Sequence, residues 1–226
     1  MTVRMVGPTV IVPSDLTSAT LPQWIEAAVR LDEAGWPLLV VGNCDPKDPL
    51  DGLAMAAYCA AQTRNIGLCA VVDPLTVEPF TLARGLATLD HMSGGRAAWR
   101  LIGGESDANR CRELVEVVRK LLTSWEPDAL IEEADKGLLS DRDRVHPIAH
   151  EGDYFAVEGP LNIPRPPQGR VPLVALAGES PFNELADLLL NDGTTLNVSL
   201  EDLAELSDMT PPVTGETLVE RLGGLQ

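Results

Sequence analysis

The feature that most constrains the fold is a regular alternation of short, wholly apolar runs with longer segments of helical period. Runs such as PLLVVGN (37–43) and IGLCAVVD (66–73) carry apolar residues on both faces of an extended chain. Strands of this kind are buried on both sides, which is typical of a parallel sheet covered by helices. The alternation therefore predicts an α/β fold built on a parallel sheet.

Six strands are expected outside one insertion, which makes about six βα units and falls short of the eight of a complete barrel. The pattern alone suits either a doubly wound sheet or an incomplete (β/α) barrel. The clearest helix has Leu114, Val118, Leu121 and Trp125 on one face. The expected strands are 3–12, 37–43, 66–73, 96–104, 171–178 and 194–200, and the expected helices are 21–35, 49–63, 77–95, 108–125, 181–191 and, more weakly, 200–208.

The alternation is interrupted by a Pro- and Gly-rich segment at 128–170, which we interpret as a hairpin insertion within a single domain covering 1–226. The segment contains an H-x₃-H pair, His146 and His150. Pro147 prevents a regular helix from aligning the two imidazoles, and no cysteine or clear third ligand lies close by in the sequence. We therefore interpret both histidines as polar anchors of the insertion and expect no metal.

The charge balance restricts the partners of the chain. Thirty-four acidic residues against seventeen basic ones give a net charge of −17, which disfavours nucleic acid and anionic membranes as partners. No apolar run approaches the roughly 20 residues of a membrane span, and the first residues lack a signal-peptide pattern. The four cysteines have no C-x-x-C spacing, which predicts reduced, buried thiols in a cytoplasmic protein.

The stretch LDHMSGGRAAWRLIGGES (89–106) places a histidine, a serine and two glycine pairs close together. A histidine can act as a general base, but the place of His91 before Ser-Gly-Gly at the end of a helical pattern favours a structural role in the turn. The serine has no G-x-S-x-G context, which argues against a serine hydrolase. The glycine pairs alone are weak evidence for a phosphate loop.

Several longer motifs are more specific. LDHMSGGRAAW, ELVEVVRKLLTSWEPDAL, VHPIAHEGDYFAVEGPLNIPRPPQGR and LVALAGES occur in this order between about residues 50 and 182. Together they resemble the bacterial-luciferase-like flavin monooxygenases, in the branch of nitrilotriacetate, pristinamycin-synthase and dibenzothiophene-sulfone monooxygenases. The resemblance resumes at DGTTLNVSL and TLVERLGG. It implies a TIM-barrel-like fold, here incomplete with about six of eight strands.

The family resemblance also implies a chemistry. Its members bind reduced FMN supplied by a separate flavin reductase, and the reduced flavin and O₂ oxygenate a small organic substrate. They are usually dimeric, so we expect a homodimer or a heterodimer with a family paralogue. No catalytic residue is assigned.

The resemblance places the flavin contacts at the ends of the expected strands. LAGES matches the family's phosphate loop, with Glu179 as an added anion, while several polar positions have changed. Arg100 stands where the relatives carry Asn, and Asp73 and Pro74 stand where they carry Ser and Thr. The cofactor-binding positions that the resemblance implies are Asn43, Val71, Gly103, Gly104, Gly178, Glu179 and Ser180.

Two functions follow. The first is an FMN-dependent monooxygenase component. The second is a non-catalytic family member, acting as a structural or regulatory subunit or as the binder of another ligand. The altered flavin-facing residues favour the second, and the retained glycine turn and insertion favour the first.

Overall fold

Two parallel sheets form the framework of the computed structural model, which describes residues 3–4, 10–13, 20–42, 51–133, 138–178, 182–190 and 195–198. The sheets meet at β5 and β10, where the backbone N–H of Trp99 donates to the carbonyl of Pro172 at 3.1 Å, beside a bridge between Trp99 and Leu173. The five-stranded sheet has the order β12 (Thr195–Val198), β2 (Val10–Pro13), β3 (Leu38–Val41), β4 (Gly67–Val72) and β5 (Ala97–Leu101), and the three-stranded sheet has the order β1 (Val3–Arg4), β11 (Leu188–Leu190) and β10 (Val174–Leu176).

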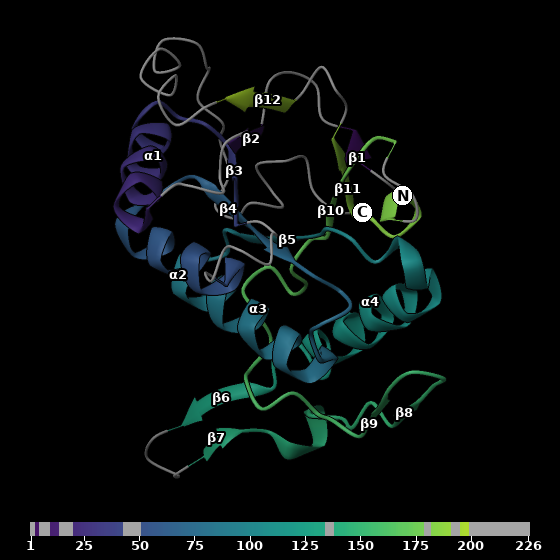
Figure 1. Cartoon of the computed structure of the whole chain (residues 1–226). Helices are drawn as coiled ribbons and strands as arrows, with labels where there is room; N and C mark the ends of the chain where they lie inside the picture. The colour runs from purple at the N-terminus through teal and green to yellow at the C-terminus, as the bar shows by residue number, and fades with distance from the viewer. Residues whose placement is uncertain are drawn as a thin grey trace.

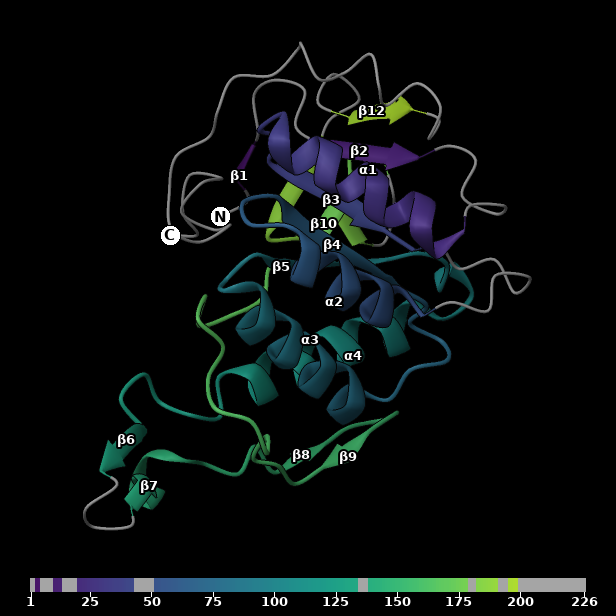
Figure 2. The same cartoon turned by 90° about the vertical axis from the view of Figure 1, so that its left-hand side faces the viewer.

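Four helices cover the outer face of the larger sheet, packed in chain order (Figures 1 and 2). Each begins with a recognisable signal: Asp51 caps α2 by accepting from the Ala54 N–H at 2.8 Å, and Asp107 caps α4 by accepting from the Arg110 N–H at 3.1 Å. α3 ends at Gly94, in the left-handed conformation. The helices are α1 (Leu21–Glu33), α2 (Gly52–Gln62), α3 (Pro79–Ser93) and α4 (Ala108–Leu122).

Alternating side chains of the strands divide the core in two. One cluster lies between the strands and the helices and contains three fully buried tryptophans, Trp24, Trp36 and Trp99. The other joins the facing sides of the two sheets and is lined by Leu38, Val40, Cys69, Val71, Ala98, Val174, Leu188 and Leu190. This second cluster is the interior of the barrel-like framework.

All six expected strands overlap an observed strand, and the first of them, 3–12, overlaps two, β1 and β2. The expected helix 181–191 is wrong. Its described residues, 182–190, include a short 3₁₀ helix, η5 (Phe182–Glu184), followed by strand β11. The physical reason is that Leu189 pairs with Arg4 on one side and Ala175 on the other, so sheet pairing overrides the local helical pattern. The expected count of six strands is therefore two below the eight described in the parallel sheets. The expected helix 200–208 lies outside the described residues.

The insertion forms hairpins, as predicted. β6 (Leu130–Glu133) pairs antiparallel with β7 (Leu138–Ser140), η4 (Arg142–Arg144) follows, and β8 (His150–Glu151) pairs antiparallel with β9 (Ala156–Val157). Both hairpins lie beyond α3 and α4, away from the sheets (Figures 1 and 2).

The two histidines of the insertion are polar anchors, as predicted. The His146 Nε2 lies 2.7 Å from an oxygen of Glu126, and the His150 Nε2 lies 3.1 Å from an oxygen of Glu113 on α4. Glu113 also accepts hydrogen bonds from backbone N–H groups of the hairpin turn, at 2.8–3.2 Å. These are the N–H groups of Asp153, Tyr154 and Phe155. Burial raises the pKa of Glu113, but these hydrogen bonds outweigh it and leave the pKa lowered, so the carboxylate is the charged centre of the turn.

The end of the insertion is fixed to the core by Asp90, a fully buried carboxylate on α3. Its Oδ1 accepts the Gln168 side-chain amide at 2.6 Å and the Ala97 N–H at 3.2 Å, and its Oδ2 accepts the Gln168 N–H at 3.0 Å. Next to it, the His91 Nε2 lies 3.2 Å from the Pro164 carbonyl. This contact agrees with the structural role predicted for His91.

Substituting Asp90 with Asn tests this junction through pH. Burial raises the pKa of Asp90 above 3.8, the ordinary value of an aspartate, although the hydrogen bonds from Gln168 lower it. As pH rises through 3.8, the unfolded chain loses this proton before the folded chain does, so the contribution of Asp90 to stability falls. We expect the stability deficit of Asp90→Asn relative to wild type to shrink as pH rises from about 4, measured by urea unfolding at several pH values. A deficit that grows over this window would contradict the assignment.

Within the part of the chain that the structure describes, no helix is long and apolar enough to cross a membrane.

Candidate functional site

The candidate site lies at the carboxyl ends of the parallel strands, where α/β folds place their ligands. The interior below it is mostly apolar, but one charged residue, Arg100 on β5, stands two residues from Ala98 and so shares its face. Arg100 is 6% exposed and pairs in register with Val71 of β4. Aliphatic side chains therefore form the floor of the site, and the buried guanidinium of Arg100 lies near its mouth.

The thiols of the interior and of α2 are poor nucleophiles. Burial raises the pKa of the Cys69 thiol to about 12, an effect that the nearby charge of Arg100 only partly offsets. Burial likewise raises the pKa of Cys59 to about 11. Both groups are protonated at neutral pH, so neither supplies a thiolate for catalysis.

Two of the predicted glycines border open space. Gly103 follows β5 with a φ of +76°, and Gly178 follows β10 with a φ of +95°. A Cβ built on either residue would meet no described atom within 4 Å, apart from the immediate neighbours. Since β5 and β10 are adjacent, the two open glycines lie on neighbouring strands at the same end of the framework. A ligand can approach the backbone closely at both positions.

Gly104 has a different role. Its φ is +87°, and an added Cβ would lie 2.6 Å from both the Cys111 Sγ and the Pro74 Cγ and 3.5 Å from the Phe182 Cζ. The residue is buried where α4, the loop after β4 and η5 meet. The prediction that Gly104 contacts a cofactor stays a prediction, but the geometry gives this glycine a packing role that the sequence did not suggest.

Arg110, at the start of α4, holds the loop that follows β4, and sequence reasoning missed it. Its guanidinium contacts the carbonyl of Pro74 and donates to the carbonyl of Val77 at 3.3 Å. It also stacks over the Phe155 ring of the insertion, 4.8 Å from the ring centre. The sequence does contain a signal for this role: Arg110 lies in the first turn of a helix, where the helix dipole disfavours a basic residue, so a specific partner is expected.

Asp73 stabilises the turn at the start of the same loop. The Oδ1 of Asp73 accepts the Leu75 N–H at 2.9 Å, which uses the carboxylate in a local turn. Of the remaining predicted positions, Val71 is buried in the interior floor, while Asn43, Glu179 and Ser180 lie outside the described residues.

With the fold and the site described, comparison with known proteins gives the family. Residues 1–214 match the family model of the luciferase-like monooxygenases. The chain belongs to the luciferase-like monooxygenase family. This membership confirms the resemblance predicted from the motifs.

Two curated members illustrate the relationship. One of the two pristinamycin IIA synthase subunits of Streptomyces pristinaespiralis is 32% identical over 202 residues, which are 88% of this chain and 72% of that protein. N-acetyl-S-(2-succino)cysteine monooxygenase of Bacillus subtilis (strain 168) is 38% identical over 138 residues, 54% of this chain. The match spans only 31% of that relative, and only 33% of the dibenzothiophene-sulfone monooxygenase of Rhodococcus erythropolis.

A solved structure supports the fold. DmoA from Hyphomicrobium sulfonivorans superposes with a TM-score of 0.69 at 21% identity, covering 83% of this chain and 52% of DmoA. This likeness shows that the chain shares the α/β fold of DmoA.

Proposed function

We propose that the chain is a monooxygenase component that binds reduced FMN and acts with O₂ on a small organic substrate. The observation that carries the proposal is the pair of open, positive-φ glycines, Gly103 and Gly178, on neighbouring strand ends in a chain of this family. Such glycines form a cradle that any side chain would fill. The residues present therefore fit a flat cofactor ending in a phosphate.

Each group at this end has a defined task in the proposed complex. Gly178, at the end of β10, would hold the phosphate through the backbone. The backbone at Gly103 would leave room for the cofactor, and the aliphatic side chains around Val71 would exclude water from it. Arg100 supplies a buried positive charge near the mouth, which favours an anionic ligand. Bound reduced flavin supplies the electrons with which O₂ is activated.

Partners belong to the same proposal. Two relatives carry names that imply assembly, nitrilotriacetate monooxygenase component A and the pristinamycin IIA synthase subunit described above. We propose a separate flavin reductase as the source of reduced FMN, and a second copy or a family paralogue as the structural partner. The buried free thiols Cys59, Cys69 and Cys111 fit the reducing environment of the cytoplasm.

Anaerobic titration with reduced FMN, followed by its absorbance, tests the proposal. We expect saturable binding that Gly178→Val weakens at least about tenfold, because the valine side chain would occupy the space of the phosphate and displace it, and one lost charge-assisted contact is worth about 1.5–3 kcal/mol. Gly94→Val is the matched control: Gly94 also has a positive φ and open surroundings, but it ends α3 at the opposite end of β5.

Two results would oppose the proposal. The first is the absence of saturable binding up to about millimolar flavin, which would favour the non-catalytic alternative. The second is equal weakening by Gly178→Val and Gly94→Val, which would trace the effect to backbone strain rather than to the cradle.

A further inference from the structure

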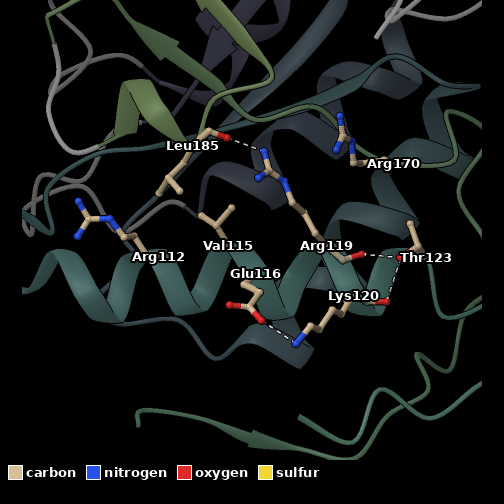
Figure 3. A pocket seen from close by; sticks show the side chains of 8 residues that line it. All are labelled: Arg112, Val115, Glu116, Arg119, Lys120, Thr123, Arg170 and Leu185. Atoms are coloured by element: carbon tan, nitrogen blue, oxygen red, sulfur yellow. Dashed lines mark hydrogen bonds and ion pairs between the residues drawn. The ribbon is translucent and has the colours of Figure 1, made fainter. Parts of the chain in front are cut away.

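A second hollow lies outside the framework, on the face of α4 that looks toward the connection between β10 and β11 (Figure 3). Its volume is about 480 Å³, within the range of small-molecule sites. In this connection the 3₁₀ helix η5 stands where a barrel unit ordinarily has a full helix, so α4 faces a short turn. The hollow is lined by Arg112, Val115, Glu116, Arg119, Lys120, Thr123, Arg170 and Leu185.

The charge of this hollow is opposite to that of the chain. Four of the eight lining residues are basic and one is acidic, whereas the whole chain has twice as many acidic as basic residues. If the buried carboxylate of Asp187 behind the lining is included, four cations face two carboxylates, an excess of two positive charges. A local positive potential in a strongly acidic protein concentrates anions at this one place.

Two of the cations are held in position by Asp187. Its Oδ1 accepts from the Nη2 of Arg119 and from the Nη2 of Arg170, each at 2.9 Å. Its Oδ2 accepts the Leu173 N–H at 2.9 Å, and the carboxylate is 7% exposed. The Arg119 Nη2 also donates to the Leu185 carbonyl at 2.5 Å. Both guanidinium groups are therefore oriented before any ligand arrives, which lowers the entropic cost of binding.

Arg119 and Arg112 keep N–H donors beyond those used in these hydrogen bonds. The Nε of Arg119 is buried and, among the described residues, has no hydrogen-bond partner. Leaving such a group unmet is costly, and it belongs to a side chain that lines the hollow. At one end of the hollow, Arg112 is exposed and uses one nitrogen on Asn109 at 3.2 Å.

Lys120 closes the side of the hollow nearest the insertion. Its Nζ lies 2.7 Å from an oxygen of Glu116 and 3.2 Å from the His150 Nδ1. This exposed ion pair is weak and exchanges readily with an incoming anion.

We propose that this hollow binds a small polyanion, either a polycarboxylate or a phosphate group, between Arg112, Arg119 and Arg170. The arrangement of two carboxylate-oriented guanidinium groups with further donors beside them is typical of sites that recognise such planar or tetrahedral anions. Arg170 and Leu185 precede β10 and β11, so the hollow lies at the amino ends of these strands, whereas the proposed flavin phosphate lies at the carboxyl end of β10. The proposal does not depend on flavin binding.

Calorimetric titration at low ionic strength, with inorganic phosphate in one arm and citrate in the other, tests this site. We expect saturable binding of at least one of the two, which identifies the preferred anion. Arg112→Gln combined with Arg170→Gln should weaken it about tenfold or more, because two charge-assisted contacts are lost. These substitutions leave the Arg119–Asp187 pair in place. Arg84→Gln, which removes an exposed charge from α3, is the matched control and should change the affinity less than about twofold.

Two further results decide against the site. Absence of saturation in both arms overturns it, as does equal weakening by Arg84→Gln, which would indicate a general charge effect. Gly178→Val should keep full affinity for the anion. Loss in that variant would place the anion at the proposed flavin-phosphate turn and would also overturn the proposal. Circular dichroism of each variant shows that it is folded.

Discussion

Arg96→Ala should lower the free energy of unfolding by about 3–5 kcal/mol, the largest effect that we expect from a single substitution. Arg96 is 5% exposed. Its Nε donates to the Ser93 carbonyl at 2.7 Å, and its Nη1 donates to the Ile66 carbonyl at 2.7 Å and to the Thr63 hydroxyl at 3.0 Å. Alanine would leave these buried acceptors without their donor.

The positive charge of Arg96 also stabilises the carboxyl end of α2. Its Nη2 donates to the carbonyls of Ala60 and Thr63, both at 3.1 Å, at the end of α2. These carbonyls form the negative end of the helix dipole, which stabilises a cation. One side chain therefore joins α2, the start of β4 and the α3–β5 turn.

Urea unfolding followed by circular dichroism measures the effect. Arg84→Ala removes an exposed arginine from α3 and should change the stability by less than about 0.5 kcal/mol. Arg96→Lys should restore only part of the loss, because an ammonium has three donors and lacks the planar fork. A cost below about 1 kcal/mol for Arg96→Ala would show that water replaces the guanidinium and would contradict this account.

Arg96 also shows what could be read from the sequence. The motif LDHMSGGRAAW correctly predicts a helix, a glycine stop and a strand, because those features depend on residues adjacent in the chain. The partners of Arg96 on α2 and at the start of β4 lie 30 to 36 residues away, and no local pattern names them. Likewise, the run Leu188–Leu190 is compatible with a helix or a strand, and only its two sheet neighbours decide.

In the candidate site, too, some features could be read from the local sequence and others depend on distant contacts. The place of Gly103 and Gly178 at strand ends could be read from the sequence, because a strand end followed by glycine is a local signal, whereas their cofactor role is a prediction from the family resemblance. The packing role of Gly104 could not, since it depends on contacts with Cys111, Pro74 and Phe182 from three separate elements. The basic hollow was hidden for the same reason: Arg112 and Arg119 are visible on one helix, but Arg170 and Asp187 complete it from distant segments.

Gly52→Ala should cost about 2–4 kcal/mol of unfolding free energy, although alanine is the better helix former. Gly52 is the first residue of α2, and its added Cβ would overlap the carbonyl oxygen of Val71 and lie 3.1 Å from the Val71 N and 3.2 Å from the Val41 O. All three atoms belong to the backbone of β3 and β4, which are paired strands and cannot yield locally. Relief of the overlap requires α2 to move away from the sheet, with loss of packing.

Gly85→Ala is the matched control, since Gly85 is also helical and crowded. There the added Cβ would lie 2.9 Å from the Leu53 Cδ1, the mobile end of a side chain. Rotation of that side chain relieves the contact, and the gain in helix propensity of up to about 1 kcal/mol offsets the cost. We expect Gly85→Ala to lie within about 1 kcal/mol of wild type in the same urea series.

The two glycines also separate stability from function. Gly52 contacts Val71, which forms the interior floor beside Arg100, so displacement at this point moves the proposed flavin site as well. Gly52→Ala should therefore weaken reduced-FMN binding under conditions in which the variant is still folded, whereas Gly85→Ala should not. A Gly52→Ala protein with wild-type stability would mean that α2 approaches the sheet less closely than the contact between Gly52 and Val71 requires.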